Sequence, residues 1–111
     1  MARLHEVLAD SEDGALLAEI IAMFLENAPQ SLAALRQAAG AGDARSISMA
    51  AHTLKGSSGN MGAQGMVQLC LTLETLGASG SVREAAALIA RLEAEFQRVQ
   101  PTLQHAARCV G

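Results

Sequence analysis

The chain has 111 residues, half of them apolar, and its only aromatic residues are Phe24 and Phe96. The formal net charge of −3, without a lysine- or arginine-rich patch, argues against a nucleic acid as partner. No apolar run reaches about eighteen residues and no basic, apolar leader opens the chain, so we expect neither a membrane span nor a signal peptide. Cys70 and Cys109 are too few and too far apart for a disulfide framework, which favours a reduced, cytoplasmic setting.

The length fits one domain over residues 1–111, with a core from about residue 4 to residue 105. The apolar residues are mainly alanine, leucine, isoleucine and methionine, which suit packed helices and provide little material for strands. Leu4, Val7 and Leu8 predict a short amphipathic helix over residues 2–9.

An apolar stripe at three- and four-residue steps predicts a long helix from about residue 15 that ends at Gly40–Gly42. Pro29 lies inside this helix and removes one backbone hydrogen bond, so we expect a kink near residues 25–28. The alternative is two helices, the second capped by Asn27. The unbroken stripe favours the kink.

Asp43 is a suitable N-cap for a second long helix that runs from about residue 44 to residue 60 or 61, with Gly62 as its stop. A third helix is expected over residues 64–76, closed by Gly77.

Ser81–Glu84 has the form of a capping box and is expected to open the final helix, which Pro101 bends or ends. Residues 106–111 resemble a frayed tail. Short loops favour antiparallel neighbours, so we predict an all-α, antiparallel up-down-up-down four-helix bundle with a short additional N-terminal helix.

His52 lies on the polar side of the second long helix. At about 100° per residue, the residues on its side are Arg45, Ser48, Met49, His52, Lys55, Gly56 and Gly59. The apolar side holds Ile47, Ala50, Leu54, Ser58 and Met61. We therefore expect His52 to face water. Lys55 is the only lysine of the chain, and each glycine inside a helix costs roughly 0.5–1 kcal/mol relative to alanine. Close approach of another molecule to the imidazole would explain Gly56 and Gly59.

Other kinds of site fit this sequence poorly. No histidine or cysteine lies at zinc-binding spacing from His52. Ser57 and Ser58 lack the strand-turn-helix setting of a nucleophilic serine, and Cys70 lies on an apolar stripe, where a packed, inert thiol is expected. The glycine spacing matches no nucleotide-binding loop.

The remaining histidines and methionines have ordinary interpretations. His5 and His105 are expected to be surface residues. The methionines at positions 23, 61 and 66 fall on or near buried stripes, whereas Met49 lies on the histidine face.

An exposed imidazole of ordinary pKa, about 6.5, is mostly neutral at pH 7, so one ring nitrogen keeps a free lone pair. That nitrogen can attack phosphorus and hold a phosphoryl group as a phosphoramidate. Lys55 could partly neutralise the phosphoryl charge, while the glycines leave room for a second protein. Such transfer depends mainly on positioning and electrostatics, which fits the small catalytic apparatus of this chain.

The sequence from His52 to Ala63 resembles the HxLKGSS…xGA signature of the histidine-containing phosphotransfer (HPt) domains of bacterial, fungal and plant phosphorelays. Leu69–Glu74 resembles the second marker of this family, LCxxLE, one helix later. The FL…P…L…L pattern of the family also has counterparts, at Phe24, Leu25, Pro29, Leu32 and Leu35. The resemblance covers essentially the whole chain.

The resemblance implies that His52 is phosphorylated through Nε2, that Lys55 helps to stabilise the phosphoryl group, and that Gly56 keeps the histidine accessible. Ser57 would be a supporting polar residue. Ser48, Met49 and Gly59 complete the expected supporting or docking set, together with the exposed side of the 15–35 helix. Glu74 is not included among the expected site residues, because a carboxylate aimed at a phosphoryl group would repel it.

The implied partners are response-regulator receiver domains, a hybrid sensor histidine kinase, or both. Mg²⁺ is expected only in the receiver domain, and this chain is expected to hold no metal or cofactor. It would be a monomeric phosphocarrier without kinase activity of its own, and it could be part of a hybrid sensor kinase. Two alternatives are the phosphoacceptor domain of a chemotaxis-type histidine kinase and a helical adaptor that binds receiver domains without transferring phosphoryl groups.

Overall fold

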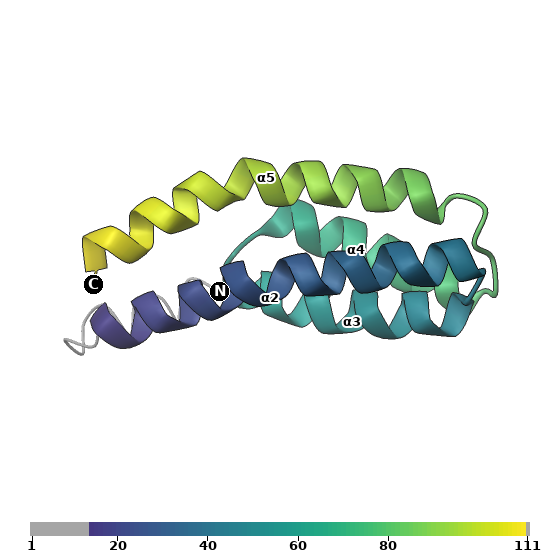
Figure 1. The fold of residues 1–111 in the computed structure, drawn as a ribbon, viewed down its shortest axis with the longest axis horizontal. Coiled ribbons are helices and arrows are strands. Elements are labelled where there is room, and N and C mark those ends of the chain that lie inside the picture. Colours follow the sequence, from purple (N-terminus) through teal and green to yellow (C-terminus); the bar gives the residue numbers. More distant parts are fainter. Residues whose placement is uncertain (1–13, 111) are drawn as a thin grey trace.

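The computed structural model describes residues 14–110. This part of the chain is helical, with no strand, so the predicted all-α class is confirmed for the described residues. Its four helices are α2 (Gly14–Ala41), α3 (Ala44–Asn60), α4 (Gln64–Ala78) and α5 (Ala85–Val110), shown in Figure 1. The short helix expected over residues 2–9, like His5, lies outside the described residues.

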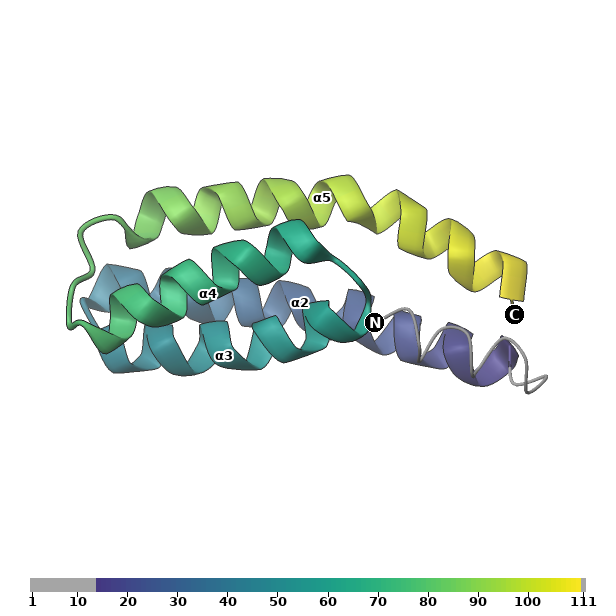
Figure 2. The ribbon, with the colours of Figure 1, turned by 180° about the vertical axis from the view of Figure 1, so that it is seen from behind.

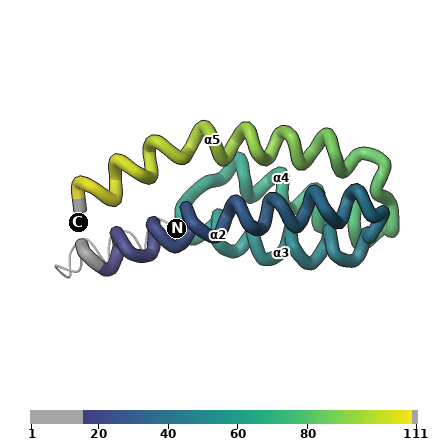
Figure 3. The backbone as a smooth tube through the Cα atoms, viewed as in Figure 1, coloured from purple at the N-terminus to yellow at the C-terminus, as the bar shows by residue number. Residues whose placement is uncertain are grey.

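The four helices form an elongated bundle of 46 × 21 × 17 Å, in which each helix turns back at a short connection (Figures 1 and 2). α2 packs against α3 and α5, and α4 packs against the same two helices. The backbone tube in Figure 3 shows that the start of α2 and the end of α5 extend together beyond α3 and α4. No helix in the described region has the length and apolar character needed to cross a bilayer.

The main core fills the space between all four helices. Within this core, Phe24 and Phe96 meet edge to face, with ring centroids 6.0 Å apart. α3 contributes its buried side, which holds Ile47, Ala51, Leu54 and Ser58. Ala51, rather than the expected Ala50, is the fully buried alanine of this helix. Burial of this side leaves the opposite side of α3 to solvent.

A second, smaller cluster holds the extended ends of α2 and α5 together. Leu17 and Ile21 of α2 are buried against Leu103, Ala106 and Ala107 of α5. The helix continues to Val110, so the prediction of a frayed tail from residue 106 is wrong for the described residues. The sequence of residues 106–110 does not itself indicate that they are helical, because the residues that pack against this end of α5 belong to α2.

Both prolines lie inside continuous helices. α2 runs unbroken through Pro29, so the alternative with two helices and Asn27 as a cap is wrong. The kink near residues 25–28 stays a prediction. α5 runs through Pro101, so this proline does not end the helix. Figure 1 shows the axis of α5 bending in its C-terminal half.

The ends of α3 follow the sequence closely. The Asp43 carboxylate accepts hydrogen bonds from the Ser46 backbone N–H at 3.1 Å and from the Ser46 hydroxyl at 2.6 Å, which confirms the predicted N-cap. Gly62 follows the helix with a positive φ of 71°, a conformation that favours glycine and stops the helix.

Two other helix ends differ from the predictions. Gly77 does not end α4 but lies buried inside it, and Gly80, with φ 83°, follows the true end of the helix. α5 begins at Ala85 after a turn at Arg83 and Glu84, so the predicted capping box at Ser81–Glu84 does not open it. A single glycine and a four-residue capping pattern are therefore not sufficient to locate the end of α4 and the start of α5.

Candidate functional site

The solvent-facing side of α3 carries a row of residues that includes His52. At three- and four-residue steps, the row contains Arg45, Met49, His52, Gly56 and Gly59. The His52 side chain is 69% exposed and the Met49 residue 61% exposed. This confirms that His52 faces water, with a large apolar side chain one turn before it.

The imidazole of His52 is held from one edge by α4. His52 Nδ1 lies 2.8 Å from Glu74 Oε2, and Lys55 Nζ donates a hydrogen bond to Glu74 Oε1 at 2.6 Å. The two oxygens of one carboxylate thus bind two side chains of the neighbouring helix. Within the described part of the chain, Nε2 of His52 has no hydrogen-bond partner.

The charge of Glu74 decides which nitrogen of His52 carries the proton. The hydrogen bond from Lys55, and to a smaller extent the one from His52, hold the pKa of the Glu74 carboxyl below its ordinary value. The carboxylate is therefore ionised at neutral pH and can only accept hydrogen bonds. His52 Nδ1 must be the donor, which leaves the lone pair of a neutral imidazole on the exposed Nε2.

Glu74 is the site residue that the sequence interpretation left out. The expected repulsion does not apply, because the carboxylate faces Nδ1 and not Nε2, and because Lys55 neutralises its charge. The signal was present in the LCxxLE marker. The sequence alone does not show that Glu74 of α4 and Lys55 of α3 lie within hydrogen-bond distance of each other.

The structure brings only some of the predicted residues close to His52. Ser48 Oγ donates to the backbone oxygen of Glu74 at 3.2 Å and so joins α3 to α4 beside the site. Ser57 Oγ donates to the Thr53 oxygen of its own helix at 3.2 Å. Ser57 also lines a groove between α2 and α3, and its hydroxyl is not hydrogen-bonded to the His52–Glu74 pair.

The two glycines of the α3 row have open space around them. A Cβ built at Gly56 or at Gly59 would meet no atom within 4 Å outside its own helix backbone and sequence neighbours. Packing within the described chain therefore gives no reason for glycine at either position, although glycine weakens a helix by about 1 kcal/mol relative to alanine. The reason must lie in the surface that these residues leave open.

Other reactive side chains lie apart from this site. Cys70 is buried beneath it, and burial raises the pKa of its thiol to about 12, which confirms the prediction of an inert cysteine. His105 is exposed, as expected, with Nε2 3.4 Å from Cys109 Sγ. In the described residues, no group of three or more His, Cys, Asp or Glu side chains could hold a metal ion.

The methionines divide differently from the prediction. Met66 is fully buried and Met61 is partly buried against the core, as expected. Met23 is 59% exposed on α2, so its assignment to the core is wrong. It is one of the residues that line the α2–α3 groove.

Comparison with known proteins agrees with this geometry. The family model described as the Hpt domain matches residues 19–102, so the chain belongs to the Hpt domain family. Among solved structures, it is similar to the crystal structure of histidine-containing phosphotransfer protein B (HptB) from Pseudomonas aeruginosa PAO1. The TM-score is 0.84 at 32% sequence identity, over 96% of this chain and 89% of that chain. Among curated protein sequences there was no match.

Membership of this family gives the chain a phosphotransfer role in two-component systems. Hpt domains are phosphocarriers rather than kinases, and their partners are the receiver domains and kinases of phosphorelays.

Proposed function

We propose that this chain is a phosphorelay intermediate in which His52 Nε2 takes a phosphoryl group from the aspartate of one receiver domain and passes it to the aspartate of another. The observation that carries this proposal is the hydrogen bond between His52 Nδ1 and Glu74. It leaves the nucleophilic lone pair on the nitrogen that faces solvent, where a second protein can reach it.

The transfer needs no proton to move between the two proteins. The lone pair of His52 Nε2 forms the N–P bond, the P–O bond to the donor aspartate breaks, and its electron pair leaves with the aspartate carboxylate. Nδ1 keeps its proton, and the positive charge that develops on the ring faces the Glu74 carboxylate. In the second transfer, a carboxylate of the next receiver attacks phosphorus, and the N–P electron pair returns to Nε2.

Lys55 has an indirect role in this scheme. Its ammonium group binds Glu74 at 2.6 Å, so the three side chains together carry no net charge while the imidazole is neutral. An unpaired Glu74 would repel the incoming phosphoryl dianion, whereas the pair with Lys55 weakens this repulsion. Gly56 leaves space beside the imidazole for the partner, and Ser48 fixes α4 at the level of Glu74.

The chain supplies the phosphorylated residue and its orientation, and the partner supplies the rest. Mg²⁺ would be held by the receiver domain, next to its aspartate. We further propose that the chain acts as a cytoplasmic monomer, without a cofactor of its own. One protein surface, the α3 row around His52, would then serve the donor and the acceptor in turn.

The test is a phosphotransfer assay with receiver domains of the source organism, each labelled on its aspartate. The wild-type chain should take up the label, and His52→Gln should take up none while keeping its helical circular dichroism. His105→Gln is the matched control, because it removes another exposed histidine of the described chain and should leave transfer unchanged.

Three results would contradict the proposal. Label on the His52→Gln variant would place the phosphoryl group elsewhere. Loading of His52 by an ATP-dependent kinase domain, with none from any receiver domain, would instead favour a phosphoacceptor domain of the chemotaxis type. A chain that binds receiver domains but never takes up label would be an adaptor.

A further inference from the structure

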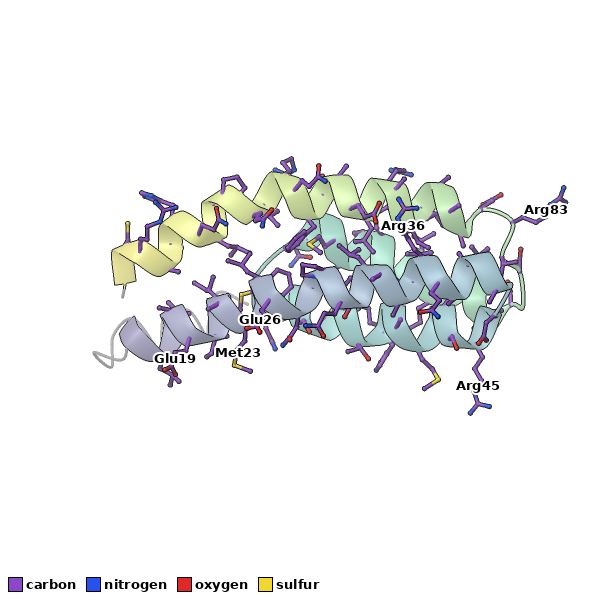
Figure 4. The ribbon with its side chains drawn as sticks, viewed as in Figure 1. Glu19, Met23, Glu26, Arg36, Arg45 and Arg83 are labelled. Carbon is purple, nitrogen blue, oxygen red and sulfur yellow. The ribbon has the colours of Figure 1, made fainter. Side chains whose placement is uncertain are left out.

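Arg45 is an exposed cation at the beginning of the α3 row. Figure 4 shows its side chain extending away from the bundle at the first turn of α3. It forms no ion pair with any residue of the described chain. The nearby Asp43 carboxylate accepts hydrogen bonds from the backbone N–H and hydroxyl of Ser46, which are the main causes of its lowered pKa, while the charge of Arg45 contributes least to that lowering.

Arg45 belongs to the same surface as the reactive nitrogen. It precedes His52 by about two helical turns, roughly 10 Å along the helix axis, and Met49 lies between them. Leu71, which is 44% exposed, lies one turn before Glu74 on α4. Because α4 runs back along α3, Leu71 lies on the opposite side of the His52–Glu74 pair from Met49. The surface is therefore a reactive histidine between two apolar side chains, with a cation at one end.

The charges of α3 differ from those of the whole chain. α3 carries two cations, Arg45 and Lys55, and no acidic residue, whereas the chain has a formal net charge of −3. Glu74 neutralises Lys55, so the full charge that α3 shows to a partner is that of Arg45. Arg36 and Arg98 cannot play this part, because each is paired with a glutamate on α5.

From these observations we propose that Arg45 is a docking residue that steers the acidic surface around a partner's phosphoaspartate onto His52. The inference deepens the proposed function and rests on it. The partner's reacting group is an aspartyl phosphate whose phosphoryl oxygens are anionic, and a chain with net charge −3 would repel it at long range. A cation roughly 10 Å from the reaction centre lies slightly beyond the Debye length at physiological salt, about 8 Å, and well within the Debye length at 0.01 M salt, about 30 Å, so its attraction is felt before contact mainly at low salt.

The test compares two charge reversals, Arg45→Glu and Arg83→Glu. Both arginines are exposed, both substitutions change the net charge equally, and Figure 4 shows the two side chains on opposite sides of the same end of the bundle. The probe is the aspartyl-phosphorylated receiver domain that loads the wild-type chain fastest. Transfer is measured over a range of receiver concentrations, which separates association from the first-order transfer step.

At low salt we expect Arg45→Glu to lower the second-order transfer constant roughly three- to tenfold, with the first-order step unchanged, and Arg83→Glu to stay within about twofold of wild type. At about 1 M salt, where the Debye length is about 3 Å, the difference between the variants should disappear. Equal constants for the two variants at low salt would overturn the inference. A salt-independent loss would do so as well, because it would mean a structural defect rather than steering.

Three outcomes separate this inference from neighbouring ones. If no receiver domain loads the wild-type chain, the proposed function itself fails, whereas loading of His52 that ignores Arg45 removes the docking role alone. If Arg45→Glu instead changes the molecular mass measured by light scattering, the residue contacts a second copy of the chain, and the steering role is contradicted.

Discussion

Glu74 Oε2 binds the Nδ1 edge of the His52 imidazole at 2.8 Å, so the carboxylate lies behind the ring and not in the path of an incoming phosphoryl group. This relationship changes the role of an acidic residue at a phosphoryl site from a repulsive charge to an orienting acceptor. It also makes the neutral variant of Glu74 the most informative substitution in the protein.

Glu74→Gln should slow phosphoryl uptake by His52 roughly fivefold. The amide can still accept a hydrogen bond from Nδ1, but it loses the charge that strengthens this bond by about 1 kcal/mol and that faces the developing cation on the ring. Single-turnover transfer from a phosphorylated receiver measures the effect. Glu84→Gln, in the exposed turn before α5, is the control and should behave as wild type. An unchanged rate in Glu74→Gln would show that the carboxylate is only structural.

The stability of the bundle should fall as the pH is lowered below about 4.5. Lys55 and His52 lower the folded-state pKa of Glu74 below its ordinary 4.5, and Arg36 does the same for Glu93. Stability from such groups is fully present above the unfolded pKa and is lost as the pH falls through the folded pKa. Thermal unfolding followed by circular dichroism between pH 7 and pH 3 should show the decline, and Glu93→Gln should reduce it. A melting temperature constant down to pH 3 would contradict this assignment.

Gly56→Ala should make the protein more stable and a poorer phosphotransfer partner. A methyl group at this position meets no atom within 4 Å, so the better helix propensity of alanine should add about 0.5–1 kcal/mol to the free energy of unfolding. The same methyl group would occupy space that the partner needs beside His52. Gly40→Ala, in α2, has equally open surroundings and is the matched control. Urea unfolding of both variants should show similar gains, with slower transfer only for Gly56→Ala.

Gly77→Ala should destabilise the protein by about 1–3 kcal/mol, the usual cost of overpacking a filled core. A Cβ there would lie 2.6 Å from the Ala44 oxygen and 2.8 Å from the Ser48 nitrogen, both backbone atoms that cannot rotate away. The α3 backbone would have to move from α4, which would lengthen the contacts of Ser48 and Glu74. Urea unfolding measures the loss. Stability equal to that of Gly40→Ala would show that the helices have room to separate.

Much of α3 could be predicted from sequence because its signals are local. Asp43, Gly62 and the alternation of buried and exposed residues fix its ends and its faces, and the structure confirms these features. The exposure of His52 followed directly from this helix. A residue that acts within three or four positions of its partner is visible in a single sequence.

The features that the sequence did not reveal depend on distant contacts. The neutralisation of Glu74 by Lys55 joins two helices, and the order of residues 106–110 depends on Leu17 and Ile21 at the other end of the chain. Gly77 looked like a helix end because glycine serves both as a stop and as a place where two backbones touch. These two uses can be distinguished only when the position of the neighbouring helix, here the α3 backbone beside Gly77, is known.

The close backbone contact at Gly77 has a consequence for how the protein meets its partners. The helix that carries His52 and the helix that carries Glu74 are pressed together there, so they cannot slide past each other without separating. The imidazole of His52 is consequently oriented when the chain folds. The entropy cost of fixing the ring is then part of folding and not part of partner binding. Each encounter can then begin from a nucleophile already aimed outward, which suits a carrier that must react with successive partners of different structure.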